Sequence, residues 1–215
     1  MFTVTHVGSW PRSRDLLKAL RDKQKGRITA EQFDRLADGE VLRCLEAQLD
    51  AGVELVTDGE LRRDNFYSFV TDKLDGAELY TLAELLERMD DKSEFEEMLH
   101  TLDVPASAIS NPTCVGRLAR REPLAVSEVR FLRQHTDLPI KATLPGPYLL
   151  TRSMWIGRIS RGEYQDKLEM GRDVVRILRE ELIELRDEGA AFVQFDEPVL
   201  TEVVMSEECG RRTFM

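Results

Sequence analysis

Carboxylates occur at two similar points of this sequence, each time directly after a short apolar run. The segment LDAGVELVTDGE delivers Asp58 and Glu60, and the segment RDEGAAFVQFDE delivers Asp196 and Glu197. Both segments have the pattern of a helix end, a glycine, a buried strand and then acids. Because parallel strands carry their sites beyond their carboxyl ends, these acids are expected on one face of a sheet. There they could hold an ammonium group, orient a metal or act as a general base.

Further polar candidates follow other apolar runs. The stretch HVGSWPR places His6 and Ser9 after the first expected strand, and Tyr148 follows the fourth. Beside the backbone N–H groups of a glycine-containing turn, Ser9 could receive a carboxylate, so serine and acids together suit the zwitterionic head of an amino acid. Each candidate also has a structural interpretation. A lone histidine is more often a hydrogen-bonded structural residue, and the Asp-Gly pair at 58–59 can be a plain turn.

The elements that would position these residues alternate between strands and helices. Helices are expected before Gly52, with Thr29 and Gln32 forming a capping box, at about 125–135 and over 161–188. Strands are expected at 2–7, 53–60, near 113–119, within LPIKATLPGPY and at AAFVQF. This order predicts an α/β fold with a parallel sheet, and a (β/α)8 TIM barrel is preferred over an open doubly wound sheet.

The number of expected strands is smaller than a whole barrel needs. A (β/α)8 barrel takes about 250 residues, and this chain of 215 residues supplies five expected strands. Residues 64–110 are mostly polar with a helical pattern, and 74–110 are interpreted as a helical insertion. A barrel segment of five strands would leave strand edges exposed. We therefore expect residues 1–215 to be one incomplete barrel domain, truncated after the first five or so strand–helix units.

Composition excludes several classes of partner. The net charge of −10 argues against nucleic acid, which selects a basic face. The basic clusters LRR (61–63) and GRR (210–212) are interpreted as solvated surface. No apolar run approaches the length of a membrane span, and no signal sequence is visible. Three cysteines without a C-x-x-C pair fit a reducing cytoplasm, and no metal-binding pattern is visible in the chain.

Four motifs taken together, THVGSWPR, VTDGELRRDNFYSF, IKATLPGPYLL and VQFDEPVL, resemble the cobalamin-independent methionine synthase family in its short, single-barrel branch. The resemblance implies a (β/α)8 barrel that transfers a methyl group from a methylated folate to the thiol of homocysteine, with zinc activating the thiolate. It also implies that Ser9 binds the amino acid carboxylate, that Glu60 and Asp196 bind its ammonium group, and that Glu197 supports the site. His6, Asp58 and Tyr148 are further candidates for site support, and no catalytic residue is assigned.

The sequence departs from this family pattern in two ways. The family's zinc ligands follow the DEP motif, and this chain ends without a match for them, so zinc is expected from the resemblance while no ligand is assigned within the chain; Cys209 is isolated. The tryptophan that packs on folate in long family members corresponds by position to Ser153 and not to Trp155. The methyl or alkyl donor and the acceptor thiol therefore stay open.

Three alternatives accompany methyl transfer to homocysteine. The first is a related thiol alkyltransferase, such as an epoxyalkane:coenzyme M transferase. The second is a metal-free lyase of the uroporphyrinogen decarboxylase type, against which the acidic strand ends weigh. The third is a barrel segment that binds its ligand without turning it over. Small molecules are the expected partners in every case, and the oligomeric state is not predicted.

Overall fold

The computed structural model describes residues 2–81, 84–85 and 110–200 of the chain. These residues fall into two compact units, which are described separately. Unit 1 comprises the described residues of Met1–Phe66, Ala125–Leu144 and Glu181–Gln194, and unit 2 comprises those of Tyr67–Leu124, Pro145–Glu180 and Phe195–Met215.

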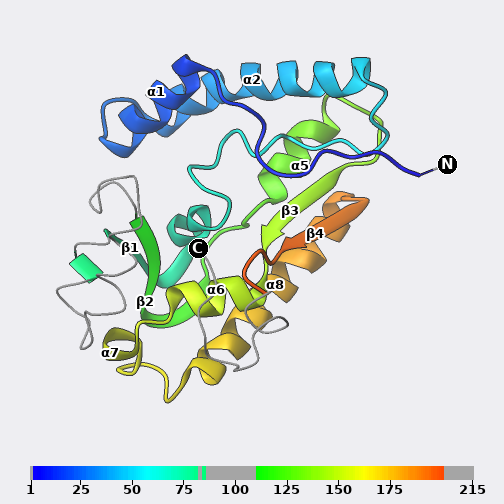
Figure 1. Cartoon of the computed structure of the whole chain (residues 1–215). Coiled ribbons are helices and arrows are strands. Elements are labelled where there is room, and N and C mark those ends of the chain that lie inside the picture. Colours follow the sequence, from blue (N-terminus) through cyan, green and yellow to red (C-terminus); the bar gives the residue numbers. More distant parts are fainter. Residues whose placement is uncertain (1, 82–83, 86–109, 201–215) are drawn as a thin grey trace. The chain divides into compact units, whose positions relative to one another are not determined.

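The first part of unit 1 is a pair of packed helices, α1 (Arg14–Gln24) and α2 (Ala30–Asp50) (Figure 1). The Ser13 hydroxyl accepts the N–H of Leu16 at the start of α1. The predicted capping box of Thr29 and Gln32 is confirmed at the start of α2, where each side chain accepts the other residue's backbone N–H. The buried face of α2 consists of Phe33, Ala37, Val41, Cys44, Leu45 and Gln48.

Four segments run parallel to one another, which confirms that the chain is α/β with parallel pairing. Single bridges join Thr5 to Leu55 and Val56 to Ile140, both parallel. Strand β3 (Lys141–Pro145) pairs with β4 (Phe192–Asp196) (Figure 1). The first two predicted strands are thus represented by isolated bridges and not by regular strands. Their short pairing is enough to place residues 6–10 and 57–63 after parallel segments.

Helices α5 (Val126–Arg133) and α8 (Lys167–Glu188) occupy the two later helical predictions. In unit 1, the buried Glu181 carboxylate near the end of α8 accepts the backbone N–H of Ala125, 2.6 Å away. The predicted helix 161–188 begins later than expected because Tyr164 is buried as a separate anchor in unit 2. Its hydroxyl accepts the Leu118 N–H and donates to Asp173.

The prediction of a helical insertion over 74–110 is wrong for residues 74–81 and 110, which lie in strands, whereas the described residues 84–85 are helical. After the 3-10 helix η1 (Ser68–Lys73), residues Leu74–Thr81 form strand β1, and Ser110–Arg120 form β2 (Figure 1). The two strands pair antiparallel, so the predicted strand near 113–119 exists but joins β1 and not the parallel set. Gly76 allows the close pairing, since a Cβ there would lie 2.4 Å from the Arg117 carbonyl oxygen. Residues 82–83 and 86–109 lie outside the described part.

Unit 2 also contains the two short helices α6 (Pro147–Met154) and α7 (Gly157–Ser160), and both contact β2. Pro147 stands at the first position of α6, where a missing N–H is tolerated. Within residues 2–81, 84–85 and 110–200, none of the helices has the length and apolar character needed to cross a membrane.

Unit 1 contains two glycines with nearly equal backbone conformation and very different surroundings. Gly59 has a φ of +69°, and a Cβ there would lie 2.7 Å from Trp10 Cβ and 2.8 Å from Cys44 Sγ; Gly52 has a φ of +73° with no atom within 4 Å. We expect Gly52→Ala to lower the free energy of unfolding by about 1–2 kcal/mol, the cost of a left-handed L-residue. Gly59→Ala should lower it by clearly more, because it adds a steric clash.

Urea unfolding followed by circular dichroism measures this difference. Gly52→Ala is the matched control for backbone strain, since both residues belong to unit 1. Equal destabilisation by the two substitutions would contradict the close contact of Trp10 and Cys44 with residue 59.

Candidate functional site

The loop that follows the second parallel segment is held by the side chain of Gln48 on α2. Its Oε1 accepts the Thr57 N–H at 3.0 Å, and its Nε2 donates to the Thr57 carbonyl at 2.8 Å. This amide therefore pairs with residue 57 as a neighbouring strand would. The sequence analysis did not single out Gln48, although a glutamine among the apolar positions of α2 is the signal that could have identified it.

Residues 58–60 form a tight turn directly after this anchor. The Asp58 Oδ1 accepts the backbone N–H of Glu60 at 3.0 Å, which is the pattern of an Asx turn. Glu60 has a φ of +55°, and in the described part of the chain it is the one non-glycine residue with positive φ. The turn aims the Glu60 side chain back at the N-terminal segment.

The structure brings two of the predicted substrate-binding residues together in unit 1. The Ser9 hydroxyl donates to Glu60 Oε2 at 3.0 Å, and the backbone N–H of Trp10 donates to the Gly59 carbonyl at 2.8 Å. Ser9 is exposed, whereas Glu60 is only 3% exposed. A hydroxyl donor at the surface thus lies against a carboxylate acceptor below it, and the pair offers complementary partners for a small zwitterion.

Arg12 and Arg63 hold the loop at residues 58–63 through hydrogen bonds. The Arg12 Nη2 donates to the carbonyl oxygens of Glu60 and Arg63, at 2.9 and 2.8 Å. The Arg63 guanidinium donates from Nε to Glu128 Oε1 at 3.0 Å and from Nη2 to Glu128 Oε2, and it also reaches the Thr143 carbonyl at 2.8 Å. Burial alone would lower the pKa of Arg63, but the Glu128 carboxylate outweighs it and raises that pKa.

The interpretation of residues 61–63 as solvated surface is therefore wrong for Arg63, which is 3% exposed. Arg62 pairs with Asp38 on α2 and stacks over the Phe131 ring, with 4.5 Å between Arg62 Cζ and the ring centroid. The physical reason is the pair of buried acceptors, since Glu128 and the Thr143 carbonyl require a cation or N–H donors in the core. Composition could not reveal this, because Glu128 lies 65 residues away.

Asp58 is the buried acid of this loop that lacks a full set of partners. Its Oδ1 accepts the Glu60 N–H, while Oδ2 has no hydrogen-bond partner. Burial, reinforced by the Glu128 carboxylate, raises the pKa of Asp58 to about 7, and Arg63 offsets part of this rise. Asp58 can therefore exchange a proton close to neutral pH.

His6, predicted as site support, lies beside this loop. Its ring meets Trp10 edge to face, with 5.2 Å between the ring centroids, and its Nε2 is buried without a hydrogen-bond partner. Its backbone carbonyl accepts from the Nζ of Lys141 on β3, and Lys141 also donates to Gln194 Oε1 at 3.0 Å. The buried Lys141 amine thus ties the first parallel segment to β3 and β4 within unit 1.

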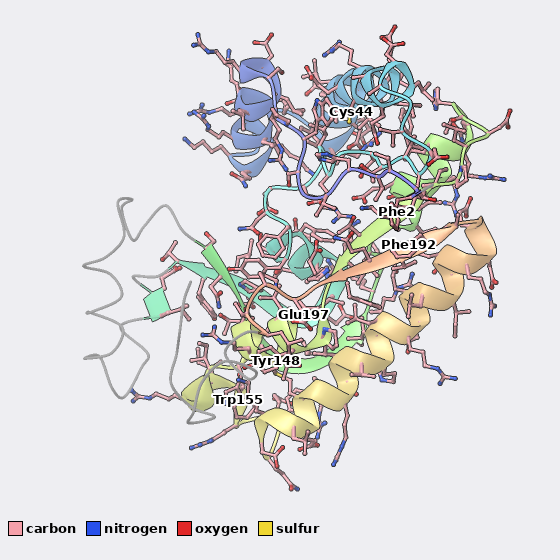
Figure 2. All side chains as sticks on the ribbon, turned by 45° about the vertical axis from the view of Figure 1, so that its right-hand side comes forward. Phe2, Cys44, Tyr148, Trp155, Phe192 and Glu197 are labelled. Atoms are coloured by element: carbon pink, nitrogen blue, oxygen red, sulfur yellow. The ribbon has the colours of Figure 1, made fainter. Side chains whose placement is uncertain are left out.

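The remaining predicted residues belong to unit 2, where Glu197 caps helix α6. Its Oε1 accepts the Tyr148 N–H at 2.7 Å and its Oε2 accepts the Leu149 N–H at 2.8 Å. Figure 2 shows Glu197 next to Tyr148. A carboxylate at this end of a helix also complements the helix dipole. Burial raises the pKa of Glu197, and the two backbone hydrogen bonds counter that rise.

The backbone of Asp196 completes this cap. Its carbonyl accepts the Gly146 N–H at 2.8 Å, and its side chain is partly exposed. Tyr148 enters the arrangement through its backbone N–H. The structure thus groups Asp196, Glu197 and Tyr148 in unit 2, and groups His6, Ser9, Asp58 and Glu60 in unit 1.

The described residues do not form a metal site. Within residues 2–81, 84–85 and 110–200, no group of three or more histidine, cysteine, aspartate or glutamate side chains is placed to hold a metal ion. Cys44 and Cys114 are both buried, and burial raises the pKa of their thiols to about 12 and about 11. Cys209 lies outside the described residues. The side chains of the described residues therefore do not provide a set of ligands that fits zinc.

Comparison with known proteins assigns the chain to a family. The family model described as the catalytic domain of cobalamin-independent synthase matches residues 1–214. The chain belongs to this family. The assignment confirms the resemblance drawn from the four motifs, and it agrees with the placement of Ser9 and Glu60 on adjoining loops.

Curated relatives carry consistent names. The methionine synthase of Thermococcus kodakarensis is 30% identical over 197 residues, covering 90% of this chain and 51% of its own length. That of Saccharolobus solfataricus is 26% identical, covering 93% and 54%. The 5-methyltetrahydropteroyltriglutamate–homocysteine methyltransferase of Buchnera aphidicola is 24% identical, covering 93% and 24%. The chain therefore spans about half the length of the first two relatives and about a quarter of the third.

Solved structures share the fold. A B12-independent methionine synthase from Shewanella, in complex with selenomethionine, matches with a TM-score of 0.60 and 26% identity, over 82% of this chain and 47% of that one. A putative B12-independent methionine synthase from Listeria monocytogenes matches with a TM-score of 0.67 and 21% identity, over 96% and 54%. The described residues show two-stranded sheets and parallel bridges, so they establish the α/β class without a closed barrel.

The raised pKa of Asp58 predicts a pH-dependent stability. The folded chain retains a proton on Asp58 up to about pH 7, whereas an unfolded aspartate loses it near its ordinary pKa of 3.8. Stability from this group is therefore complete below about pH 4 and is lost as the pH rises through 7. Asp58→Asn should remove this component, so the melting temperature of the variant should fall less than that of wild type between pH 5 and pH 8.

Differential scanning fluorimetry across that range measures the effect. Asp137→Asn is the control, because Asp137 is exposed. The effects of the other titrating groups are common to the wild type and the variants, so they cancel when the curves are compared. Parallel curves for wild type and Asp58→Asn would show that residue 58 does not carry the proton.

Gly146 and Glu197 offer a test of the helix cap. A Cβ at Gly146 would lie 2.1 Å from Glu197 Oε1, while the Gly146 φ of −74° suits any residue. Gly146→Ala should therefore displace the Glu197 carboxylate and lower the free energy of unfolding by about 1–2 kcal/mol, the cost of losing a helix cap. In a Glu197→Ala background the same substitution should cost little.

Urea unfolding of the wild type, both single variants and the double variant gives this coupling. Additive losses from the two substitutions would contradict the proposed contact between residues 146 and 197.

Proposed function

We propose that this chain contributes the amino-acid-binding part of a methyltransferase that methylates the thiol of homocysteine to form methionine. The observation that carries the proposal is the contact of Ser9 with Glu60, 3.0 Å between Ser9 Oγ and Glu60 Oε2, on loops that follow neighbouring parallel segments. Family membership and the names of the relatives support it. The complete (β/α)8 barrel and the cytoplasmic location remain predictions of the same proposal.

Glu60 and Ser9 would bind different groups of the amino acid ligand. The ammonium group of an amino acid would take the Glu60 carboxylate as a charged hydrogen-bond acceptor. The Ser9 hydroxyl would then turn from Glu60 to the ligand carboxylate, alongside the backbone N–H groups of its turn. A role for Asp196 in binding the ammonium group remains a prediction of the family resemblance. A solved family member bound to selenomethionine, an amino acid of the product type, is consistent with this arrangement.

Zinc enters the proposal only through the family resemblance. The described residues do not supply a set of zinc ligands. The methyl donor is equally open, with methylated folate as the first candidate. Another thiol alkyl transfer and a segment that binds without turnover remain alternatives, while family membership favours transfer over the metal-free lyase.

Calorimetric titration of the 215-residue chain with L-methionine tests the binding step directly. Wild type should bind, and Glu60→Gln should weaken binding by about 10- to 100-fold, since charged hydrogen bonds contribute about 1.5–3 kcal/mol. Ser9→Ala should weaken it by about 3- to 10-fold, the scale of a neutral hydrogen bond. Glu122→Gln is the control, because Glu122 is exposed on the other unit.

The same titration with N-acetyl-L-methionine separates specific from general affinity, because the acetyl group removes the ammonium charge. Acetylated ligand should fail to bind. If wild type binds neither L-methionine nor L-homocysteine, or binds the acetylated ligand equally well, the proposed function is wrong for this chain.

A further inference from the structure

The loop that presents Glu60 holds it in a conformation that L-residues rarely adopt. Its φ of +55° lies in the left-handed region, where a side chain crowds its own backbone. Something must therefore keep Glu60 there. The Arg12 guanidinium holds the Glu60 carbonyl, and the Asp58 carboxyl holds the Glu60 N–H at 3.0 Å. Of these two, Asp58 is the one that can change its charge near neutral pH.

We propose that Asp58 is a positioning residue for Glu60, and that the turn presents Glu60 for ligand binding while Asp58 is protonated and loosens when Asp58 ionises. The inference rests on the proposed function, because it names the control of the same amino acid site. Asp58 touches no ligand in this scheme and acts through Glu60 alone.

The geometry gives the reason for this dependence. Asp58 is 6% exposed, and its Oδ2 is buried without a partner. A neutral carboxyl tolerates such a position, whereas an ionised one leaves an unsolvated charge. The Glu60 N–H favours the ionised carboxyl, but burial outweighs this hydrogen bond. In our scheme, solvation of the ionised Oδ2 rearranges residues 58–60 and releases the Glu60 N–H. The raised pKa of Asp58, about 7, places the change within the neutral range.

The charged and titratable groups around Asp58 come from several elements. They are Glu128 on α5, Arg62, Arg63 and Glu60 on the loop itself, Arg12 in the N-terminal segment and Cys44 on α2. Arg63 offsets part of the rise in the pKa of Asp58, and its guanidinium also forms a two-point pair with Glu128. The Glu128 carboxylate also opposes a negative charge on Asp58, because it raises the pKa of Asp58.

The first test follows the turn without any ligand. In a ¹⁵N-labelled wild-type chain, the amide signal of Glu60 should shift with a midpoint near pH 7, because its hydrogen-bond acceptor titrates. In Asp58→Asn, whose side-chain oxygen can still accept the N–H, the signal should show no such midpoint. A Glu60 amide that does not respond to pH in wild type would overturn the proposal.

The second test measures binding of L-methionine by calorimetry at pH 6 and pH 8. Over this range a group with a pKa near 7 goes from about 90% to about 10% protonated. Wild-type affinity should therefore fall by about 3- to 10-fold from pH 6 to pH 8, up to the limit set by the protonated fraction. Asp58→Asn should bind with nearly equal affinity at both pH values, and Asp58→Ala, which removes the acceptor, should bind at least 10-fold more weakly.

The outcomes separate the two proposals. Wild-type affinity that is unchanged or rises with pH, or an Asp58→Ala variant that binds as wild type, overturns the role of Asp58. Rescue by asparagine but not by alanine supports positioning through the hydrogen bond to Glu60. If wild type binds no methionine while the Glu60 amide still titrates, the proposed function fails and the link between Asp58 and Glu60 stands.

Discussion

The ion pair between Arg63 and Glu128 is the interaction on which unit 1 depends. Both side chains are almost fully buried, and the guanidinium also reaches the carbonyl of Thr143 on β3. One side chain therefore joins the loop after the second parallel segment to α5 and to β3. A charge in this position is tolerated because its hydrogen bonds are charge-assisted and formed at two points. Removing either partner would strand the other in the core.

The candidate site is built outward from that pair. Arg63 fixes one end of the loop, Gln48 fixes the other at Thr57, and Arg12 spans the carbonyls between them. These hydrogen bonds restrict the backbone conformation of the turn at 58–60. The restricted turn directs the Glu60 side chain toward Ser9. Pre-organisation of this kind reduces the ordering that a ligand would otherwise have to impose on binding.

In each acidic pair, Asp58 with Glu60 and Asp196 with Glu197, one carboxylate accepts backbone N–H groups. It is the first acid of the first pair and the second acid of the second pair. In the first pair, Asp58 accepts a backbone N–H and Glu60 is the proposed ligand acceptor. In the second, Glu197 accepts the N–H groups that begin α6, and Asp196 is the predicted ligand acceptor. In the proposed assignment, one acid of each pair shapes its own loop and the other is available to a ligand.

The sequence by itself determined the α/β class, the parallel order of four segments and the positions of the main helices. Apolar periodicity, glycine stops and the Thr29 capping box are local signals, and local signals survive in the folded chain. Family membership likewise followed from four short motifs. The acids at residues 58, 60, 196 and 197 stood out because two segments share one pattern, in which a helix end, a glycine and an apolar run precede the acids.

Only the tertiary structure decided which of these residues bind the protein's own backbone. Arg63 looked like solvated surface until Glu128, far along the chain, was placed beside it. Residues 74–81 looked helical until they paired with β2 through the close approach at Gly76. The proton on Asp58 depends on burial and on Glu128 together. Partners distant in sequence set charge, burial and strand pairing, and no local pattern contains them.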